Sequence, residues 1–349
     1  MPLMNPSSSR CLVTGGAGFI GSALVWALNQ RGCRDIVVAD FLDAGTRWRG
    51  AVPLAGNREE KQRNLQPLRV AAYVEADVFR ETLRGDPEAF GRFDAVFHLG
   101  ACSSTTETNE AYLQDNNLEY TKEHARWALA RGARFIYASS AATYGDGAAG
   151  MDDRAGDLAA LAPLNLYGRS KHAFDVCAQQ EGWLSRIVGL KYFNVFGPNE
   201  DHKGDMRSVA NKAYRQILET GRVKLFKSYR PGIKDGEQQR DFLYVKDAVD
   251  MTLHFAFTNT EAAGLFNIGS GTASTWVALA SAVFAAMDRT PQIEFIEMPE
   301  AMREKYQYFT RAEIAKLRAA GYAKPVTPLD QAVADYVRNY LAPGRRLGE

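Results

Sequence analysis

Cysteine is scarce in this sequence, with four residues among 349 and no C-x-x-C pair. Cys11, Cys33, Cys102 and Cys177 lie far apart along the chain. This spacing argues against a disulfide framework and against a zinc site, and it is typical of reduced thiols in a cytoplasmic protein. Histidine is also rare, with five residues, and we predict no metal site.

An excess of one charge and long apolar runs are absent as well. Lys and Arg number 42 against 41 Asp and Glu, a formal net charge of +1, so a nucleic acid is not an expected partner. No run approaches the roughly 20 apolar residues of a membrane-spanning helix. Residues 1–10 are polar and lack the apolar segment of a signal peptide. We therefore expect a cytoplasmic protein without a membrane partner, long enough for one large domain or two smaller ones.

The sequence does contain a glycine-rich turn, formed by Gly15, Gly18 and Gly21. The apolar residues 11–13 before it are typical of a strand, and residues 22–28 after it are apolar at helical spacing. In this context Gly15 permits a tight turn, Gly18 lets the backbone approach a pyrophosphate, and Gly21 lets the helix pack closely on the strand. The turn therefore predicts a dinucleotide site, although its G-x-x-G-x-x-G spacing alone would also fit a plain tight turn.

Strands and helices are expected to alternate through the first 198 residues. This βαβ rhythm predicts an α/β fold, a Rossmann-type doubly wound parallel sheet with a smaller C-terminal substrate lobe. Ligands of such a sheet bind beyond the carboxyl ends of its strands. The expected strands are 36–40, 73–77, 95–100, 135–140 and 187–191, and the expected helices are 112–131, 166–180 and 208–218.

After residue 198 the alternation stops, and two later segments, 241–245 and 264–269, are interpreted as returns to the sheet layer. Residues 50–69 show no clear period and receive no assignment. We predict an NAD(P)-binding Rossmann domain from residues 1–198 and 241–285, and a substrate-binding lobe from residues 199–240 and 286–349.

Acidic and basic residues after the expected strands bear on the cofactor. Asp40 lies about twenty residues beyond the glycine turn, where a carboxylate binds the ribose of a dinucleotide. Asp40 favours NAD because a carboxylate repels a 2′-phosphate, whereas the nearby Arg47 favours NADP, so the choice stays open. Asp77 is placed to meet an adenine amino group. His98, inside an expected buried strand, is interpreted as a core histidine and not as a ligand.

Tyr167 and Lys171 are four residues apart, which places both on one face of the expected helix. A free Tyr has a pKa of about 10, and a neighbouring ammonium favours the phenolate that a base needs. Lys171 can also bind a nicotinamide ribose. Ser139 and Ser140 end the preceding strand, so a hydroxyl there can hold the reacting oxygen. These residues predict proton removal from a carbinol with hydride transfer to a nicotinamide.

With these motifs the sequence resembles the extended short-chain dehydrogenase/reductase superfamily, and within it the family of ADP-L-glycero-D-manno-heptose 6-epimerases. The glycine turn and Tyr-x-x-x-Lys mark the superfamily, whereas residues 101–107 and 202–204 are more specific to the heptose epimerases. The resemblance covers nearly the whole chain except residues 1–10, 50–69 and the last few. Further segments that carry it are 115–117, 137–145, 163–171, 192–198, 240–245, 306–307 and 317–322.

The resemblance implies an isomerase that converts ADP-D-glycero-D-manno-heptose to ADP-L-glycero-D-manno-heptose at carbon 6. Bound NADP, with NAD as the alternative, would oxidise the substrate transiently to a ketone and return the hydride to the opposite face. The product would be the nucleotide-activated heptose for lipopolysaccharide core synthesis. The implied partners are a small nucleotide-sugar substrate and further copies of the chain, since the family favours a pentameric homo-oligomer.

The resemblance also implies roles at matching positions. Tyr167 and Lys203 would act as acid/base groups, Lys171 would support both the cofactor and Tyr167, and Ser140 would orient the substrate. The expected cofactor contacts are Gly15, Gly18, Phe19, Ile20, Gly21, Asp40, Phe41, Arg47, Asp77, Leu99, Gly100, Ala101, Cys102, Ser103, Asn116, Lys171 and Val195. The expected substrate contacts are Ser140, Asn194, Asp205, Lys212, Phe226, Lys227, Ser228, Tyr229, Arg240 and Tyr306.

Other interpretations stay open. A different nucleotide-sugar epimerase or a dehydratase would use the same frame, although residues 141–143 lack the acidic pair typical of a dehydratase. A non-enzymatic NADP-sensing regulator is a third possibility, but it need not keep Tyr167 and Lys171. Without the resemblance, residues 202–204 would equally be an exposed basic turn, so one or two acid/base groups are possible. The residues that depart from the family pattern are Phe41, Asp205 and Lys212.

Overall fold

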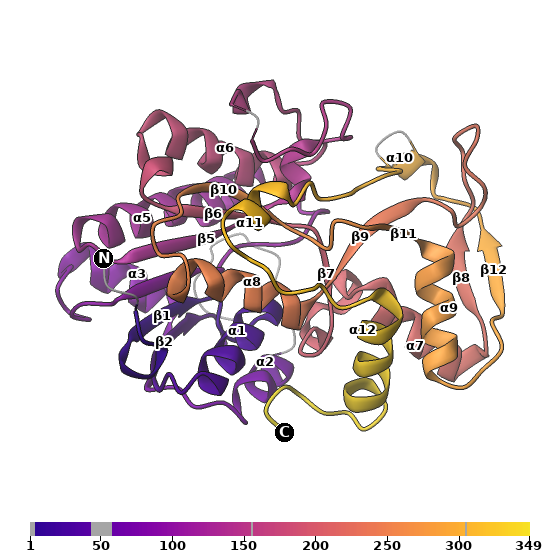
Figure 1. Cartoon of the computed structure of the whole chain (residues 1–349), viewed down its shortest axis with the longest axis horizontal. Helices are drawn as coiled ribbons and strands as arrows, with labels where there is room; N and C mark the ends of the chain where they lie inside the picture. The colour runs from indigo at the N-terminus through magenta and orange to yellow at the C-terminus, as the bar shows by residue number, and fades with distance from the viewer. Residues whose placement is uncertain (1–3, 43–57, 155, 304–305) are drawn as a thin grey trace.

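Three β-sheets organise the part of the chain that the structure describes (Figure 1). The computed structural model describes residues 4–42, 58–154, 156–303 and 306–349. The largest sheet has seven strands in the order β10-β6-β5-β4-β1-β2-β3, and all neighbours in it are parallel. Its strands are β1 (Arg10–Thr14), β2 (Asp35–Asp40), β3 (Ala72–Glu75), β4 (Ala95–His98), β5 (Arg134–Ser140), β6 (Val188–Tyr192) and β10 (Gly264–Ile268).

The strand order of this sheet reverses between β1 and β4. The chain first builds outward from β1 through β2 to β3, and then continues on the other side from β4. The point of reversal is where ligands of open α/β sheets bind, outside the carboxyl ends of the strands. The predicted Rossmann-type fold is confirmed.

The core lies on both faces of this sheet because alternate strand residues point to opposite sides. In β1, Cys11 and Val13 join the apolar core on one face, whereas Leu12 joins the core on the other. One face is covered by α1 (Phe19–Gln30) and α8 (Val245–Phe257), and the other by α3 (Ala76–Gly85), α5 (Tyr120–Ala130) and α6 (Leu166–Gln180).

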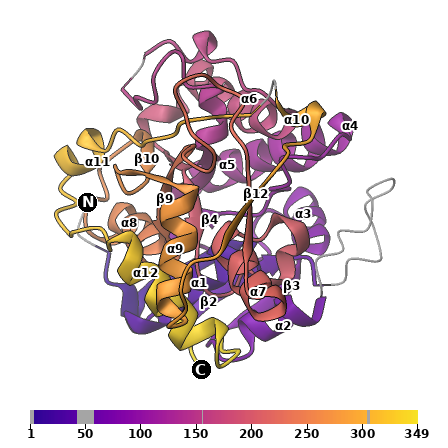
Figure 2. The ribbon, with the colours of Figure 1, turned by 90° about the vertical axis from the view of Figure 1, so that its right-hand side faces the viewer.

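A second group of elements lies to the right of the main sheet in Figure 1 and faces the viewer in Figure 2. A three-stranded sheet has the order β11-β9-β7, and β12 pairs with β8. Helix α9 contacts both α7 and α12. The bounds are β7 (Asn194–Phe196), α7 (Val209–Thr220), β8 (Val223–Phe226), β9 (Gln239–Tyr244), β11 (Ala273–Thr275), α9 (Trp276–Ala286), β12 (Ile293–Ile296) and α12 (Leu329–Tyr336).

Short helical segments complete the described chain. Two of them matter for the site: α2 (Arg58–Leu65), which falls where the sequence showed no period, and the 3₁₀ segment η6 (Asp201–Met206), which is broken at Gly204. The others include α4 (Glu110–Leu113), the π-helical segment η2 (Gln114–Glu119), η3 (Ala141–Tyr144), α10 (Glu300–Arg303) and α11 (Ala315–Ala319).

Two sequence predictions of strands are wrong in part. The strand expected at 73–77 ends at Glu75, and Asp77 lies in the first turn of α3, a position that the helix dipole favours for an acid. The segment 241–245 does not return to the main sheet, because β9 pairs with β7 and β11. Apolar patterning predicts a strand but not its neighbours. The domain boundaries themselves stay a prediction.

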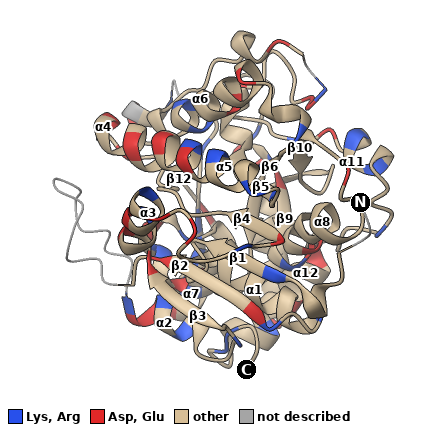
Figure 3. Cartoon of the chain, turned by 90° about the vertical axis from the view of Figure 1, so that its left-hand side faces the viewer, with Lys and Arg blue, Asp and Glu red and all other residues tan. Residues whose placement is uncertain are grey.

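The outer helices carry both signs of charge. Figure 3 shows Lys and Arg interspersed with Asp and Glu on α2, α3 and α5. Across the ranges that the structure describes, no helix combines the length and apolar character needed to cross a membrane.

Candidate active site

The glycine turn joins β1 to α1 at the carboxyl edge of the main sheet. Gly15 has a φ of +69°, and a Cβ there would lie 2.7 Å from the backbone nitrogen of Gly100. A Cβ on Gly21 would lie 2.0 Å from the carbonyl oxygen of Gly15. Both positions therefore require glycine, one for the turn and one for the close approach of the helix, as the sequence predicts.

Helix α1 presents its N-terminus to the region above this turn. Its N-cap is Gly18, whose lack of a side chain leaves the first turn without a side-chain cap. The N–H groups of Phe19, Ile20 and Gly21 have no partner within an α-helix. Together with the helix dipole they form an arrangement that suits a phosphate.

Asp40 ends β2 beside the glycine turn and is tied to it. Its Oδ2 accepts hydrogen bonds from the backbone nitrogens of Ala17 and Gly18 at 2.8 and 3.1 Å. Its Oδ1 accepts from Lys61 Nζ at 2.9 Å, and Lys61 also donates to the carbonyl oxygen of Phe41. The carboxylate thus orders the turn and is paired with a cation, while its predicted contact with a ribose stays a prediction.

The sequence pattern gives no signal for Lys61, because α2 shows no apolar periodicity. The helix is almost entirely polar, and only Asn64 among its residues is buried. The other predicted basic contact, Arg47, lies outside the described residues.

The segment after β4 is the second part of the candidate cofactor site, after the glycine turn. The backbone nitrogens of Leu99 and Gly100 donate to Thr14. Cys102 is bound through both its N–H and its carbonyl to Asn117, at 2.8 and 3.0 Å. Asn117 lies in the π-helical segment η2, a geometry often found at functional sites.

Asn117 links this segment to α6, the helix that carries Tyr167 and Lys171. Its Nδ2 donates to Ser170 Oγ at 2.9 Å, and Ser170 Oγ donates to the carbonyl oxygen of Tyr167. The neighbouring Asn116, which the sequence singled out, is 5% exposed and donates to Asn117 Oδ1. The sequence signal for Asn117 was present in residues 115–117, but its connecting role depends on the tertiary contact.

The predicted catalytic residues converge at the end of β5 and the start of α6. Tyr167 is hydrogen bonded to Ser140, and burial outweighs this bond, so the pKa of Tyr167 lies above its ordinary value. Lys171 Nζ donates to the carbonyl oxygen of Ala138 at 2.9 Å. Burial lowers the pKa of Lys171 to about 8, although Asp175 and Cys102 act in the opposite direction. The expected lowering of the pKa of Tyr167 is therefore not found, because desolvation disfavours its phenolate.

Lys203 lies in η6 and reaches the beginning of α1. Its Nζ lies 5.2 Å from the centre of the Phe19 ring, at the beginning of α1. Burial lowers its pKa, Lys212 adds to this effect, and Glu200 opposes it. The interpretation as an exposed basic turn does not hold for Lys203, whose side chain is packed against the cofactor edge of the sheet.

Arg240 is the main charged group on the lobe side. It is 7% exposed on β9, and its guanidinium lies 5.5 Å from the ring centre of Trp276 and 5.2 Å from that of Tyr306. Its Nη1 donates to the carbonyl oxygen of Gln239, and burial lowers its pKa. No carboxylate in the described part of the chain forms an ion pair with Arg240, so the site can accept an anion from outside.

The other predicted substrate contacts form a looser group. Asn194 is exposed and accepts a hydrogen bond of 3.4 Å from Thr310. Lys212 Nζ donates to the carbonyl oxygen of Asp205. The segment after β8, which directly follows Phe226, is held by hydrogen bonds to its neighbours. The side chains of Lys227 and Tyr229 donate to Glu297. The backbone nitrogens of Ser228 and Tyr229 donate to Asp235 and to the Tyr308 hydroxyl.

The remaining predicted cofactor residues are placed by their elements. Ile20 lies in the first turn of α1, Asp77 in that of α3, and Val195 in β7. Ala101 and Ser103 flank Cys102 in the segment after β4. Their contacts with a cofactor stay predictions.

The residues present fit a dinucleotide. The turn excludes a Cβ at two positions, the N-terminus of α1 has no side-chain cap, and the buried hydroxyl of Tyr120 has no partner among the described residues. His98 is instead a satisfied core histidine, since Thr14 and Thr121 lie at 2.9 and 3.0 Å from its two nitrogens. Over the described ranges, no cluster of three or more His, Cys, Asp or Glu residues is arranged to hold a metal ion.

The chain is similar in sequence to known epimerases. Residues 11–269 match the NAD dependent epimerase/dehydratase family. The chain is 49% identical over 332 residues to ADP-L-glycero-D-manno-heptose-6-epimerase of Nitratidesulfovibrio vulgaris, covering 95% of this chain and 98% of that protein. It is 44% identical over 340 residues to the protein of the same name from Fusobacterium nucleatum, again covering 95% and 98%.

Solved structures agree with this placement. Helicobacter pylori ADP-L-glycero-D-manno-heptose-6-epimerase superposes with a TM-score of 0.76 at 26% identity, covering 96% of this chain and 97% of that one. Thermus thermophilus UDP-glucose 4-epimerase, solved with NAD, superposes with a TM-score of 0.70 at 26% identity, covering 94% and 97%. The predicted resemblance is confirmed, and the chain belongs to the NAD dependent epimerase/dehydratase family.

Proposed function

We propose that this protein inverts carbon 6 of ADP-D-glycero-D-manno-heptose to give ADP-L-glycero-D-manno-heptose. The proposal is supported by two buried groups on different elements that are able to transfer protons. Tyr167 lies on α6 and is hydrogen bonded to Ser140, and Lys203 lies in η6 against Phe19. The substrate is taken from the relatives of 44–49% identity, whose names specify the ADP-heptose and carbon 6.

The chemistry requires the carbonyl of the intermediate ketone to present both faces in turn. When bound, a nicotinamide dinucleotide supplies the acceptor and later the donor of the hydride. In one presentation Tyr167 exchanges the proton of the substrate oxygen, which Ser140 holds by a hydrogen bond. In the other presentation the oxygen points elsewhere and needs a second donor within about 3 Å. Lys203 serves there, because its lowered pKa brings proton exchange nearer to neutral pH.

Arg240 supports a nucleotide-sugar substrate. The buried guanidinium of Arg240, which has no carboxylate partner among the residues that the structure describes, suits a pyrophosphate, since its fork of N–H groups matches two phosphate oxygens. The aromatic rings of Trp276 and Tyr306 fix its position. We therefore propose that the predicted lobe, residues 199–240 and 286–349, binds the substrate while the main sheet binds the cofactor.

For the cofactor we propose NADP. The ion pair between Lys61 and Asp40 cancels the charge by which a carboxylate would repel a 2′-phosphate. Lys61 is 18% exposed at this point, so its ammonium remains accessible to a phosphate. Arg47 is the second predicted cation. Replacing Lys61 with Met should weaken NADP binding at least tenfold and leave NAD binding nearly unchanged, as measured by titration of the cofactor-free enzyme. Equal loss for both nucleotides would assign Lys61 to the fold alone.

The two acid/base groups are tested by single-turnover oxidation of each heptose epimer, followed through the absorbance of the reduced nicotinamide. We expect Tyr167→Phe and Lys203→Met each to lose 10²–10⁴-fold, but with opposite epimers. Lys224→Met is the matched control, because it removes an exposed Lys of β8 that is not among the predicted site residues. If both catalytic variants slow both epimers equally, one base with a rotating ketone is the better account.

We further propose a cytoplasmic homo-oligomer. The described cysteines are free, and Cys11, Cys33 and Cys102 are buried as thiols, which suits a reducing compartment. The resemblance supports a pentamer. Sedimentation equilibrium of the purified protein decides between this state and a monomer of 38.6 kDa.

A further inference from the structure

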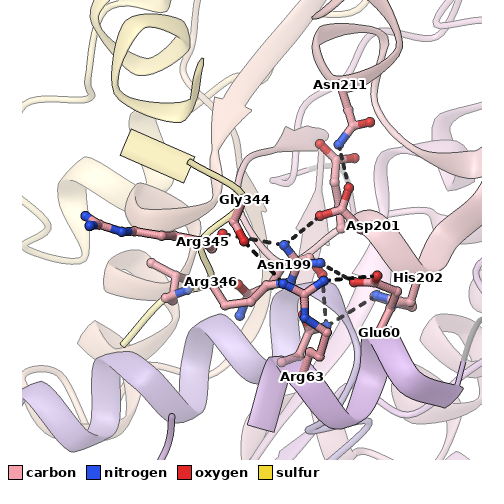
Figure 4. A network of polar contacts seen from close by, with 12 residues as sticks. Glu60, Arg63, Asn199, Asp201, His202, Asn211, Gly344, Arg345 and Arg346 are labelled. Atoms are coloured by element: carbon pink, nitrogen blue, oxygen red, sulfur yellow. Dashed lines mark hydrogen bonds and ion pairs between the residues drawn. The ribbon is translucent and has the colours of Figure 1, made fainter. Parts of the chain in front are cut away.

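The segment from Gly344 to Glu349 lies across two elements that carry the proposed site, α2 and η6. Arg63 of α2 donates to the carbonyl oxygen of Gly344, and the backbone nitrogen of Leu347 donates to Asn199 Oδ1 at 3.0 Å. Figure 4 shows Arg63, Asn199 and Gly344 in one polar network with Arg346. Nothing in the proposed reaction uses this segment.

Arg346 binds one carboxylate from each of the two elements. Its Nη2 pairs with Glu60 of α2, and its Nη1 lies 2.9 Å from Asp201 Oδ2 of η6. The Arg346 side chain is 5% exposed, and those of Glu60 and Asp201 are 21% and 13% exposed. Burial raises the pKa of Asp201, but Arg346 and Arg215 outweigh it, so the net pKa is lowered and the carboxylate is charged at neutral pH.

Each of these carboxylates lies next to a lysine of the proposed site. Glu60 directly precedes Lys61, which pairs with Asp40 beside the glycine turn. Asp201 lies two residues before Lys203, which reaches the Phe19 ring. The guanidinium therefore joins the element that carries the cofactor lysine to the element that carries the second acid/base group.

A second set of contacts fixes the same two elements to the glycine turn. Asn64 Nδ2 of α2 donates to the carbonyl oxygens of Ala17 and Asn199, at 3.1 and 3.0 Å, and lies 3.3 Å from His202 Nδ1. Asn199 in turn donates to Ser22 Oγ of α1. These contacts hold α2 and η6 in one arrangement. Among the described residues, Arg346 alone forms ion pairs that bridge the two elements.

We propose that Arg346 is a positioning residue that sets Lys61 and Lys203 against the cofactor site by clamping Glu60 and Asp201; the catalytic half of this inference rests on the proposed function. Without the guanidinium, two poorly solvated carboxylates face each other and repel, so α2 and η6 separate. Both lysines then lose their positions while Tyr167, on α6, keeps its own.

The test compares Arg346→Ala and Arg346→Lys with Arg345→Ala. Arg345 is the matched control because it is the exposed neighbour and its side chain points away from the network in Figure 4. We expect Arg346→Ala to weaken NADP binding at least tenfold and to slow at least tenfold the oxidation of the epimer that Lys203→Met impairs. Oxidation of the epimer that depends on Tyr167 should change less than threefold. Arg346→Lys keeps the charge but lacks the two-pronged guanidinium. Its NADP affinity and its oxidation rate should therefore lie between those of Arg346→Ala and the wild type.

Added guanidinium gives a readout that a merely structural role would not move. A pocket of about 470 Å³, lined among others by Arg63, Asp201 and Arg346, opens beside the network. A free guanidinium ion at low millimolar concentration should enter it in Arg346→Ala and restore the Lys203-dependent rate several-fold, with no effect on the wild type. If Arg346→Ala does not fold, Arg346→Lys carries the comparison.

The outcomes are distinct. Equal loss with both epimers, or unchanged NADP binding in the folded variant, overturns the clamp. If the wild-type protein does not oxidise either heptose epimer, the proposed function fails, and the NADP titration alone decides on Arg346. In that case a tenfold loss relative to Arg345→Ala supports the clamp, and equal affinity overturns it.

Discussion

At the scale of single residues, burial sets the proton chemistry of the site. It disfavours the charged form of each group, which raises the pKa of Tyr167 and lowers those of Lys171 and Lys203. The candidate site thus combines a phenol that stays neutral with lysines that release their protons more readily than in water. The sequence singled out these residues but predicted a lowered pKa for Tyr167. The pKa is raised instead, because desolvation depends on atoms that only the fold brings together.

The lowered pKa of Lys171 predicts a limit to activity at high pH. Below its pKa of about 8 the ammonium is charged and can bind ribose hydroxyls, and above it that charge is lost. We expect kcat/KM to decline above about pH 8. Burial lowers the pKa of His98, and that of His202 to about 3, so neither contributes a step between pH 6 and 8. The pH profile of the wild type measures this, and Lys171→Arg should move the decline upward. An unmoved decline would assign it to another group.

At the scale of elements, sequence patterns predicted most of the main sheet and its helices. The helix at 166–180 is confirmed with those bounds, since Asn165 accepts from Gly168 N as its N-cap and the apolar positions follow a helical period. The patterns failed for β9, because strand pairing decides which sheet a strand joins. They also failed for α2, because this helix has no apolar face. Periodicity reports burial of one face, and α2 is held by polar contacts instead.

The junction of β1 and α1 gives a prediction at this scale. A Cβ at Gly21 would clash with the Gly15 carbonyl at 2.0 Å, so the start of α1 must shift in Gly21→Ala. We expect a loss of about 1–3 kcal/mol in unfolding free energy, together with weaker NADP binding. Gly85→Ala, at the end of α3, is the control because its Cβ would meet nothing within 4 Å. Urea unfolding and NADP titration measure both effects. Tight binding by Gly21→Ala would show that close packing is not required.

A buried ion pair fastens α6, the helix of Tyr167 and Lys171, to the main sheet. Asp175 of α6 pairs with Lys191 of β6 at 2.9 Å, with 0% and 1% of their side chains exposed. Asp175 also accepts from the hydroxyls of Tyr137 and Ser139 of β5. Lys191→Met should cost about 3–5 kcal/mol of unfolding free energy, because it leaves a buried carboxylate without its cation.

The double variant Lys191→Met, Asp175→Asn separates the pair from simple packing. It should be less destabilised than the sum of the two single variants, since neither charge remains. Chemical denaturation of all four proteins completes the cycle. Additive losses would mean that the two side chains contribute independently.

At the scale of the whole molecule, the candidate site is assembled from parts far apart in the chain. Lys61 and Asp40 are 21 residues apart, and Arg346 contacts Glu60 across 286 residues. Motifs found the residues that lie near the carboxyl ends of the strands, because that edge is a property of the fold class. They did not find Lys61 or Arg346, whose roles arise from tertiary contacts without a local signal, and they marked the segment 115–117 without the connecting role of Asn117. The position of Lys203 was expected from the resemblance and not from spacing.

The central claim is that hydride leaves and returns to the same substrate molecule at one site. The direct measurement uses ADP-D-glycero-D-manno-heptose deuterated at carbon 6, mixed with an equal amount of unlabelled substrate that carries ¹³C elsewhere in the sugar. Mass spectrometry of the product then follows both labels. We predict that deuterium stays at carbon 6 in the molecules that brought it, with none lost to water and none found in the ¹³C-labelled product. Loss of deuterium to solvent, or its transfer between molecules, would contradict the account.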